Sequence, residues 1–319
     1  MAITTEQRAA RRHGIFSSDV PRIMAGGGVS VALEKLGQQE LVEEDPNTIA
    51  LELAAGAKIE KFLLDAYEKQ TGSLLMERSP DTGMHPEFQW LGSHPDAIRN
   101  PKRGVEGKTL GEYNRHLWGD GGDEVPDNVL WQCLTHCAVW GFESVDIPMC
   151  VLDANTLKYI VCERPPPIKI FNVPADADLI QRMITECAVV WECVKEGKLP
   201  PPVKPSDVRL IYRKDTGAVI EATDEVFAFY CSLTETRKQV SEHSALEEKW
   251  AFEIQKFMKD ASELRYRGRT LVTWKCSSEG EKVDLKELAD SYPSVREACL
   301  KTVPGSRRFL PKKLKGEIV

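Results

Sequence analysis

Hydrophobic positions recur with a helical period in several long stretches of the chain. Residues 48–70 carry apolar side chains at the i, i+3, i+4 and i+7 spacing of one face of an amphipathic helix. The same spacing predicts helices over residues 128–140, 176–196 and 223–264. Glu60 lies at the edge of the first apolar stripe, where a carboxylate needs either a salt-bridge partner or a metal ion.

Shorter apolar runs between these helices predict β-strands. The predicted strands cover residues 74–78, 88–94, 104–109, 145–152, 157–163 and 270–274, with a hairpin over 208–220. Near the N-terminus, a helix that opens at Ser17 with Pro21 in its first turn is predicted to end at the glycines 26–28. Asp127 is predicted to cap the helix over 128–140.

The clearest linker is the proline-rich segment 200–205. It divides the chain into residues 1–205, where strands and helices are mixed, and residues 206–319, where one long amphipathic pattern dominates. Such a pattern usually serves helix packing or contact between subunits. We therefore expect two domains.

Composition places the chain among ordinary globular proteins. It has 319 residues, of which 42% are hydrophobic and 29% charged. No apolar run approaches the ~18 residues of a membrane span, and the N-terminus lacks the apolar core of a signal peptide. The nine cysteines contain no Cys-x-x-Cys pair. We expect a cytoplasmic protein with reduced thiols and no membrane contact.

Cys133 and Cys137, with His136 between them, are candidate zinc or iron–sulfur ligands. No second cysteine pair follows, and the two thiols lie one helical turn apart in an apolar pattern. Buried structural cysteines are the better interpretation. The net charge of −7 argues against a nucleic-acid partner, but basic clusters at 11–12, 102–103 and in the last 19 residues keep a basic groove open.

The most informative chemical pattern is Asp96 followed by Glu106-Gly107-Lys108. On a strand, Glu106 and Lys108 project from the same side, and Asp96 from the preceding strand can join them. Two carboxylates ~4 Å apart repel each other by a few kcal/mol, so a cation must lie between them if both are ionised. Oxygen ligands suit Mg²⁺ or Mn²⁺. The pattern indicates a metal-dependent phosphodiesterase, although an exposed hairpin edge could carry the same residues.

The order Gly56-x-x-x-Glu60, Asp96, Glu106-x-Lys108 and Gln132 resembles the PD-(D/E)xK nucleases. Within them it resembles the YqaJ-like viral recombinase family, which includes phage lambda exonuclease. The resemblance covers roughly residues 8–200 and extends to an opening motif over 12–19 and to the stretch 118–132. The chain departs from the family pattern after Gln132, where Cys-Leu-Thr replaces a second glutamine and a histidine, and at Ala97, where glycine is frequent.

This resemblance implies an α/β (mixed α+β) fold. A restriction-endonuclease-like core, in which helices flank a central mixed sheet, would occupy residues 1–205. Residues 206–319 would form a mainly helical C-terminal extension with a basic tail.

The resemblance also assigns roles around the metal. Asp96, Glu106 and the backbone carbonyl of Gly107 would bind Mg²⁺, which Mn²⁺ could replace, and Glu60 would complete the site directly or through water. Lys108 would orient and help to deprotonate the attacking water and stabilise the phosphorane.

Other side chains would contact the substrate. Gln132 would position water or the scissile phosphate. Arg12 and Ser18 match positions that contact a 5′ phosphate, and a serine beside an arginine is a reasonable anion pocket. Helix capping by Ser18 is compatible with that role.

The function implied is a Mg²⁺-dependent 5′→3′ exonuclease that degrades double-stranded DNA ends in phage-type recombination, in the cytoplasm of a bacterial host. Its partner would be a single-strand annealing protein, and the chain would form a homo-oligomer. The alternatives are an endonuclease on the same core and an inactive DNA-binding or scaffold relative. No single residue excludes RNA as the substrate.

Overall fold

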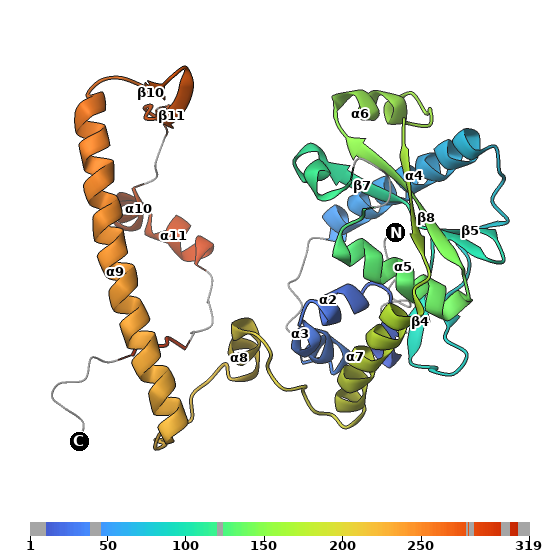
Figure 1. Cartoon of the computed structure of the whole chain (residues 1–319), viewed down its shortest axis with the longest axis horizontal. Helices are drawn as coiled ribbons and strands as arrows, with labels where there is room; N and C mark the ends of the chain where they lie inside the picture. Colours follow the sequence, from blue (N-terminus) through green and yellow to red (C-terminus); the bar gives the residue numbers. More distant parts are fainter. Residues whose placement is uncertain are drawn as a thin grey trace. The chain divides into compact units, whose positions relative to one another are not determined.

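The computed structural model describes residues 11–38, 46–119, 124–278, 280, 284–300 and 307–311. Its contacts divide the chain into two units, residues 1–212 and residues 213–319 (Figure 1). Each unit is described by itself.

The central sheet of the first unit is mixed. Its strands follow the order β2-β5-β6-β8-β7, and β9 pairs with the other edge of β8. Strands β6 and β7 run parallel to β8, whereas the β2–β5, β5–β6 and β8–β9 pairs are antiparallel. The strands are β2 (Glu77–Arg78), β5 (Ala97–Asn100), β6 (Arg103–Val105), β7 (Lys108–Gly111), β8 (Ser144–Leu152) and β9 (Lys169–Pro174).

Strand β8 is the axis of this sheet, and one interruption beside it matters for the site. β6 pairs with the first residues of β8 and β7 with its last residues, so β6 and β7 follow each other along one edge. Glu106 and Gly107 lie between them, and the Glu106 N–H donates to the Asp146 carbonyl (3.0 Å). The continuous strand predicted over 104–109 is therefore wrong: it is two short strands with Glu106-Gly107 at the break.

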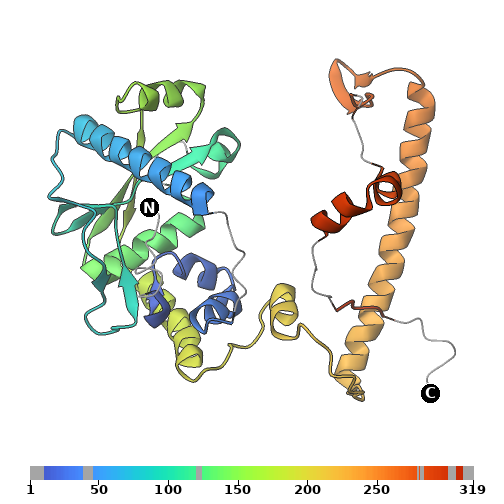
Figure 2. The same cartoon turned by 180° about the vertical axis from the view of Figure 1, so that it is seen from behind.

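Helices cover both faces of the sheet (Figures 1 and 2). Helix α4 (Pro46–Thr71) packs Leu64 and Tyr67 against Ala97 and Val105, and Figure 2 shows it crossing in front of the strands. Helix α5 (Asp127–Trp140) packs on the opposite face, where Ile147 and Met149 of β8 point. These packed layers confirm the mixed α/β fold and the helices predicted over 48–70 and 128–140.

A smaller sheet and further helices complete the unit. The small sheet has the order β1-β4-β3, and helices α2, α3 and α7 pack together beside α5. The elements are η1 (Arg11–His13), β1 (Ile15–Phe16), α2 (Val20–Met24), α3 (Gly28–Lys35), β3 (Gly83–Met84), β4 (Leu91–Ser93), η2 (Glu112–Leu117), α6 (Ala154–Val161), α7 (Ala177–Lys195) and α8 (Pro205–Ile211).

Two segments predicted as strands are helices, and in both cases an aspartate explains the difference. Asp153 accepts hydrogen bonds from the N–H groups of Asn155 (2.9 Å) and Thr156 (2.7 Å), which begins α6 where a strand was predicted. Buried Asp207 likewise accepts from the backbone N–H of Lys204 (3.2 Å) and begins α8 where a hairpin was predicted. Each aspartate accepts hydrogen bonds from backbone N–H groups at the start of a helix, which have no partner within the helix itself. A side chain that caps these groups therefore favours a helix over a strand.

Two predicted helix ends are also corrected. Gly28 begins α3 rather than ending a helix, and a Cβ at this position would lie 2.9 Å from Cγ2 of Val190, so only glycine lets α3 approach α7. Pro126, not Asp127, is the N-cap of α5. Asp127 stands in the first turn instead, where its charge favours the helix dipole.

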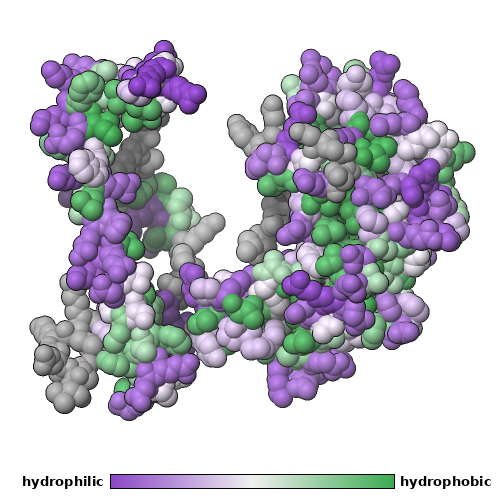
Figure 3. Space-filling view, viewed as in Figure 1, coloured by the Kyte–Doolittle hydropathy of each residue, from purple (hydrophilic) through white to green (hydrophobic). Residues whose placement is uncertain are grey.

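The second unit is built around one long helix. Helix α9 (Asp224–Met258) is capped by Thr223, and it is followed by β10 (Glu263–Tyr266), β11 (Arg269–Thr273), α10 (Leu285–Ser291) and α11 (Pro293–Cys299). Within the described part of this unit, Met258 is the only buried apolar residue. Phe229, Trp250 and Phe257 are exposed, and Figure 3 shows apolar and polar side chains interleaved at the surface of the helix. None of the helices that the structure describes has the length and apolar character needed to cross a bilayer.

Candidate metal centre

Asp96 and Glu106 meet at one end of the β5–β6 hairpin. Asp96 directly precedes β5 and Glu106 directly follows β6, and the register pairs Ala97 with Val105. The N–H of Gly107 donates to Asp96 Oδ2 at 2.8 Å, which holds the two segments together. Both acids are buried, with 8% of Asp96 and 4% of Glu106 exposed. The structure thus brings together two acids that lie ten residues apart in the sequence.

Lys108 and Gln132 converge on the same oxygen of Glu106. Lys108 Nζ lies 2.8 Å from Glu106 Oε1 and donates to Gln132 Oε1 at 2.8 Å. Gln132 Nε2, from helix α5, donates to Glu106 Oε1 at 2.6 Å. An ammonium and an amide are therefore fixed beside one carboxylate oxygen, which leaves the other oxygen of Glu106 for a different partner.

That other oxygen, Glu106 Oε2, is buried and accepts no hydrogen bond from the residues that the structure describes. His136 Nε2 lies 3.3 Å away, which is an ion-pair distance if the ring is protonated, but the two atoms do not form a hydrogen bond. The other ring nitrogen of His136 lies 3.0 Å from Ser93 Oγ. Buried polar atoms nearly always have partners, so a buried carboxylate oxygen without one is consistent with a missing cation.

His136 was missed as a neighbour of Glu106. From the sequence, His136 was a candidate ligand only together with Cys133 and Cys137. Those two cysteines are buried free thiols, as predicted. A signal existed: His136 follows Gln132 by four residues, so both lie on one face of α5.

The electrostatics of the acids point the same way. Burial, with the nearby charges of Glu106 and Glu60, raises the pKa of Asp96 well above its usual range. Burial also raises the pKa of Glu60, and Glu106 adds to this effect. Burial disfavours the ionised form of Glu106 too, but Lys108 and His136 more than offset it and hold the pKa of Glu106 below its usual range.

Lys108 remains a cation in this environment. Burial disfavours its ammonium, but the charge of Glu106, the hydrogen bond to Glu106 and the charge of Asp96 together outweigh burial and raise the pKa of Lys108. Three mutually repelling acids with one buried lysine form a site that a divalent cation would stabilise.

The donor set fits Mg²⁺ or Mn²⁺. Asp96, Glu106 and the Gly107 carbonyl offer hard oxygen ligands, and Mg²⁺ typically takes one or two carboxylates and completes its shell with water and phosphate. A Cβ at Gly107 would lie 3.2 Å from Leu63 Cδ1 and 3.4 Å from Asp96 Oδ2, so glycine keeps this backbone accessible. No group of three His, Cys, Asp or Glu residues in the described part of the chain encloses a metal site.

The segment proposed to bind a 5′ phosphate lies beside β4. Arg12 is in η1 and Ser18 follows β1, and both side chains are exposed. Strand β1 runs parallel to β4, which leads into Asp96. Ser18 is not the N-cap of α2: Asp19 holds that place, and its carboxylate accepts from Phe16 N (3.0 Å). The 5′-phosphate role of Arg12 and Ser18 stays a prediction.

Comparisons with known proteins give the following similarities. Residues 7–143 match the family model of the YqaJ-like viral recombinase domain. An alkaline exonuclease from Laribacter hongkongensis is 18% identical, with a TM-score of 0.45, over 61% of this chain and 94% of that one. A phage-related exonuclease from Haemophilus somnus 129PT is 13% identical, with a TM-score of 0.40, over 57% of this chain and 94% of that one. Among curated proteins there is no match.

Proposed function

We propose that the chain is a Mg²⁺-dependent 5′→3′ exonuclease acting on double-stranded DNA ends. The match of residues 7–143 to the YqaJ-like viral recombinase domain supports a deoxyribonuclease of recombination. The observation that carries the proposal is that the two carboxylate oxygens of Glu106 have different surroundings. One oxygen takes Lys108 and Gln132, and the other is buried without a hydrogen-bond partner among the described residues. Such a carboxylate can bind a metal ion through one oxygen while its other oxygen positions Lys108 and Gln132, the groups that would contact water and phosphate.

Asp96, Glu106 and the carbonyl of Gly107 would hold the ion, and Glu60 would bind through water. When bound, a divalent cation supplies a Lewis acid for the phosphoryl oxygen and activates water. The chain's own residues do the rest. Lys108 donates to the attacking water and to the charge that develops on the phosphate, and Gln132 orients the same groups. Mn²⁺ has the same ligand preference and would substitute for Mg²⁺.

The 5′ polarity rests on the segment beside β4. Arg12 and Ser18 are exposed there, and a guanidinium with a hydroxyl is suited to a terminal phosphate. A single-strand annealing protein as partner and a homo-oligomeric state belong to the same proposal. The exposed apolar side chains of α9 are suited to contact between subunits.

The test uses three substrates with Mg²⁺: a linear duplex with 5′ phosphates, the same duplex with 5′ hydroxyls, and a covalently closed circle. We expect nucleotide release that is fastest from the phosphorylated duplex and absent from the circle. Arg12→Gln should remove the preference between the two linear substrates, while Arg164→Gln, which also changes an exposed arginine, should keep it. Cutting of the closed circle would identify an endonuclease instead.

A further inference from the structure

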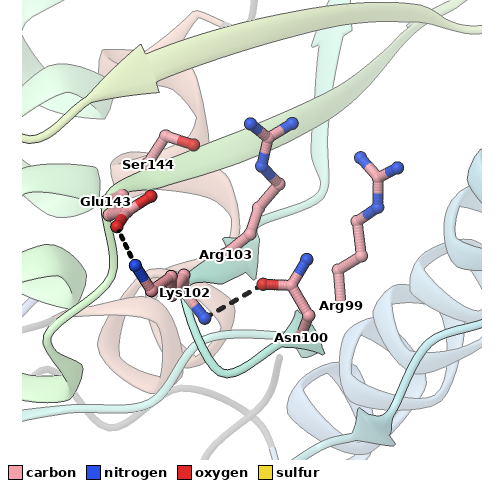
Figure 4. A pocket seen from close by; sticks show the side chains of 6 residues that line it. All are labelled: Arg99, Asn100, Lys102, Arg103, Glu143 and Ser144. Atoms are coloured by element: carbon pink, nitrogen blue, oxygen red, sulfur yellow. Dashed lines mark hydrogen bonds and ion pairs between the residues drawn. The ribbon is translucent and has the colours of Figure 1, made fainter.

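The turn between β5 and β6 carries a second polar pocket, at the opposite end of the hairpin from Asp96 and Glu106 (Figure 4). Its volume is about 340 Å³. Three of the side chains that line it are basic, and the lining residues are Arg99, Asn100, Lys102, Arg103, Glu143 and Ser144. No role in the metal centre accounts for these residues.

The arginines share one carboxylate, that of buried Asp146. Asp146 already accepts from Tyr67 Oη (2.5 Å) and Asn172 Nδ2 (2.7 Å), and Arg99 Nη1 lies 3.3 Å from its Oδ2. Arg103 Nη1 lies 3.5 Å from the same oxygen, beyond the ordinary range of a hydrogen bond. One carboxylate therefore faces two guanidinium groups, and Arg103 is the weakly held one.

Most N–H donors of the Arg103 guanidinium have no acceptor among the described residues. In the described part of the chain, the long contact to Asp146 is the sole side-chain contact of its guanidinium with an acceptor, and 40% of the Arg103 side chain is exposed. Lys102 pairs with Glu143 at the surface, and these two charges offset each other. The excess positive charge of the pocket thus resides on the arginines.

Ser144 provides an independent observation. It is 5% exposed, it lines the pocket, and its Oγ has no hydrogen-bond partner among the described residues. Figure 4 shows Ser144 at the start of β8, beside the side chain of Arg103. A buried hydroxyl without a partner is uncommon, and a ligand that accepts from it would satisfy it. A guanidinium and a hydroxyl that face one space select an oxyanion.

We propose that this pocket binds a backbone phosphate of the DNA substrate through Arg103 and Ser144, with Arg99 behind them. The proposal rests on the proposed function. β5 covers four residues, Ala97–Asn100, so the pocket lies about 13 Å from the metal centre along the strand. That distance is about four base-pair rises of a duplex, which is the span that a DNA molecule held at both sites has to cover. The pocket would hold the duplex in place while its end lies at the metal.

Binding of a short duplex to the full chain, without divalent cations, tests this directly. Fluorescence anisotropy at several salt concentrations gives the affinity and its salt dependence. Losing one phosphate contact reduces the slope of log K against log salt by about 0.9. We expect this reduction, and roughly 3–10-fold weaker binding at low salt, for Arg103→Gln. The control is Arg164→Gln, which changes an exposed arginine outside the pocket and should leave the slope of log K against log salt unchanged.

Ser144→Ala separates binding from folding. Removing a buried hydroxyl that has no partner should leave Tm unchanged or higher, while the pocket predicts weaker DNA binding. An unchanged salt slope for Arg103→Gln together with unchanged affinity for Ser144→Ala would overturn the proposal, provided that the wild type binds DNA. If the wild type does not bind duplex DNA, the proposed function itself fails.

A final arm identifies the source of the phosphate. Inorganic phosphate could raise the Tm of the wild type but not that of Ser144→Ala, while Arg103→Gln and Ser144→Ala bind DNA with unchanged affinity. That result would identify the occupant as a free phosphate and contradict the DNA assignment. Inorganic phosphate that competes with duplex in the wild type more strongly than in Arg103→Gln would support it.

Discussion

Glu106 and Asp146 are buried to the same extent, with 4% of each exposed. Glu106 lies at the break between β6 and β7, and its N–H donates to the carbonyl of Asp146 on β8 at 3.0 Å. Their surroundings differ. Glu106 has Lys108 and Gln132 on one oxygen, but it also has two like-charged neighbours, Asp96 and Glu60, and its other oxygen accepts no hydrogen bond from a described group. Asp146 is surrounded by donors from Tyr67, Asn172 and two arginines. Burial alone therefore does not identify a functional acid, whereas a cluster of neighbouring acids does.

The difference has an electrostatic consequence. Burial raises the pKa values of Asp96 and Glu60, and repulsion from the neighbouring acids adds to the effect. A cation bound among these acids would offset their repulsion. The region around Asp146 has an excess of positive charge, so it is stable as it stands and can accept an anion.

The largest effect is expected on catalysis. Lys108→Met removes the ammonium beside Glu106 and should reduce kcat by about 10²-fold or more, because a donor to developing charge is lost. Thr109→Ala, on the next, exposed position of β7, is the matched control and should digest duplex at the wild-type rate. Single-turnover digestion with Mg²⁺ measures both. Equal rates for the two variants would show that Lys108 has no role in catalysis.

The next effect concerns stability at the other acid. Asp146→Asn leaves two guanidinium groups without their carboxylate and should destabilise the protein by about 2 kcal/mol, less than for a fully buried pair because both arginines are partly exposed. That corresponds to a Tm lower by about 4–8 °C. Digestion per folded molecule should change far less than in Lys108→Met. A drop in activity without a drop in Tm would place Asp146 in the catalytic machinery.

A smaller effect of opposite sign is expected at the metal centre. Without metal, Asp96→Asn removes a buried charge next to two other acids and should raise Tm by about 2–4 °C, or about 1 kcal/mol. Added Mn²⁺ should then no longer raise Tm as it does for the wild type. The carboxylate-to-amide control Glu87→Gln is exposed and should change neither value. A lower metal-free Tm for Asp96→Asn would show that Asp96 is a structural acid like Asp146.

The smallest effect is a pH dependence at Tyr67. Burial and the hydrogen bond to Asp146 raise the pKa of Tyr67, so its stabilising effect is fully present below the ordinary tyrosine pKa of about 10 and is lost as pH rises above it. Tyr67→Phe should cost about 1 kcal/mol at pH 8. The difference in Tm from the wild type should shrink at pH 10.5. Tyr159→Phe, at an exposed position, should show no difference at either pH.

Much of the candidate site could be predicted because its signals are local. Strand periodicity placed Glu106 beside Lys108, and the motif order added Asp96 and Gln132. What could not be predicted depends on neighbours that are distant in sequence. The break at Glu106-Gly107 arises because β6 and β7 pair with different parts of β8.

The same reasoning explains the fold. Helices α4, α5 and α7 were predicted because their apolar stripes are long, whereas β5 and β9 were missed because short strands give weak periodicity. The strand assigned to 157–163 failed because the cap at Asp153 was overlooked. The boundary at 205 and the role of the second unit stay predictions, since the exposed apolar face of α9 does not itself identify a partner.

The central claim is that Glu106 binds a divalent cation and that Asp146 does not. Calorimetric titration of Mn²⁺ into the wild type, Glu106→Gln and Asp146→Asn tests it most directly, because both variants change one buried carboxylate to an amide. We expect the wild type and Asp146→Asn to bind Mn²⁺ with similar affinity, and Glu106→Gln to lose at least tenfold. Wild-type affinity in Glu106→Gln, with each variant folded by circular dichroism, would contradict the account.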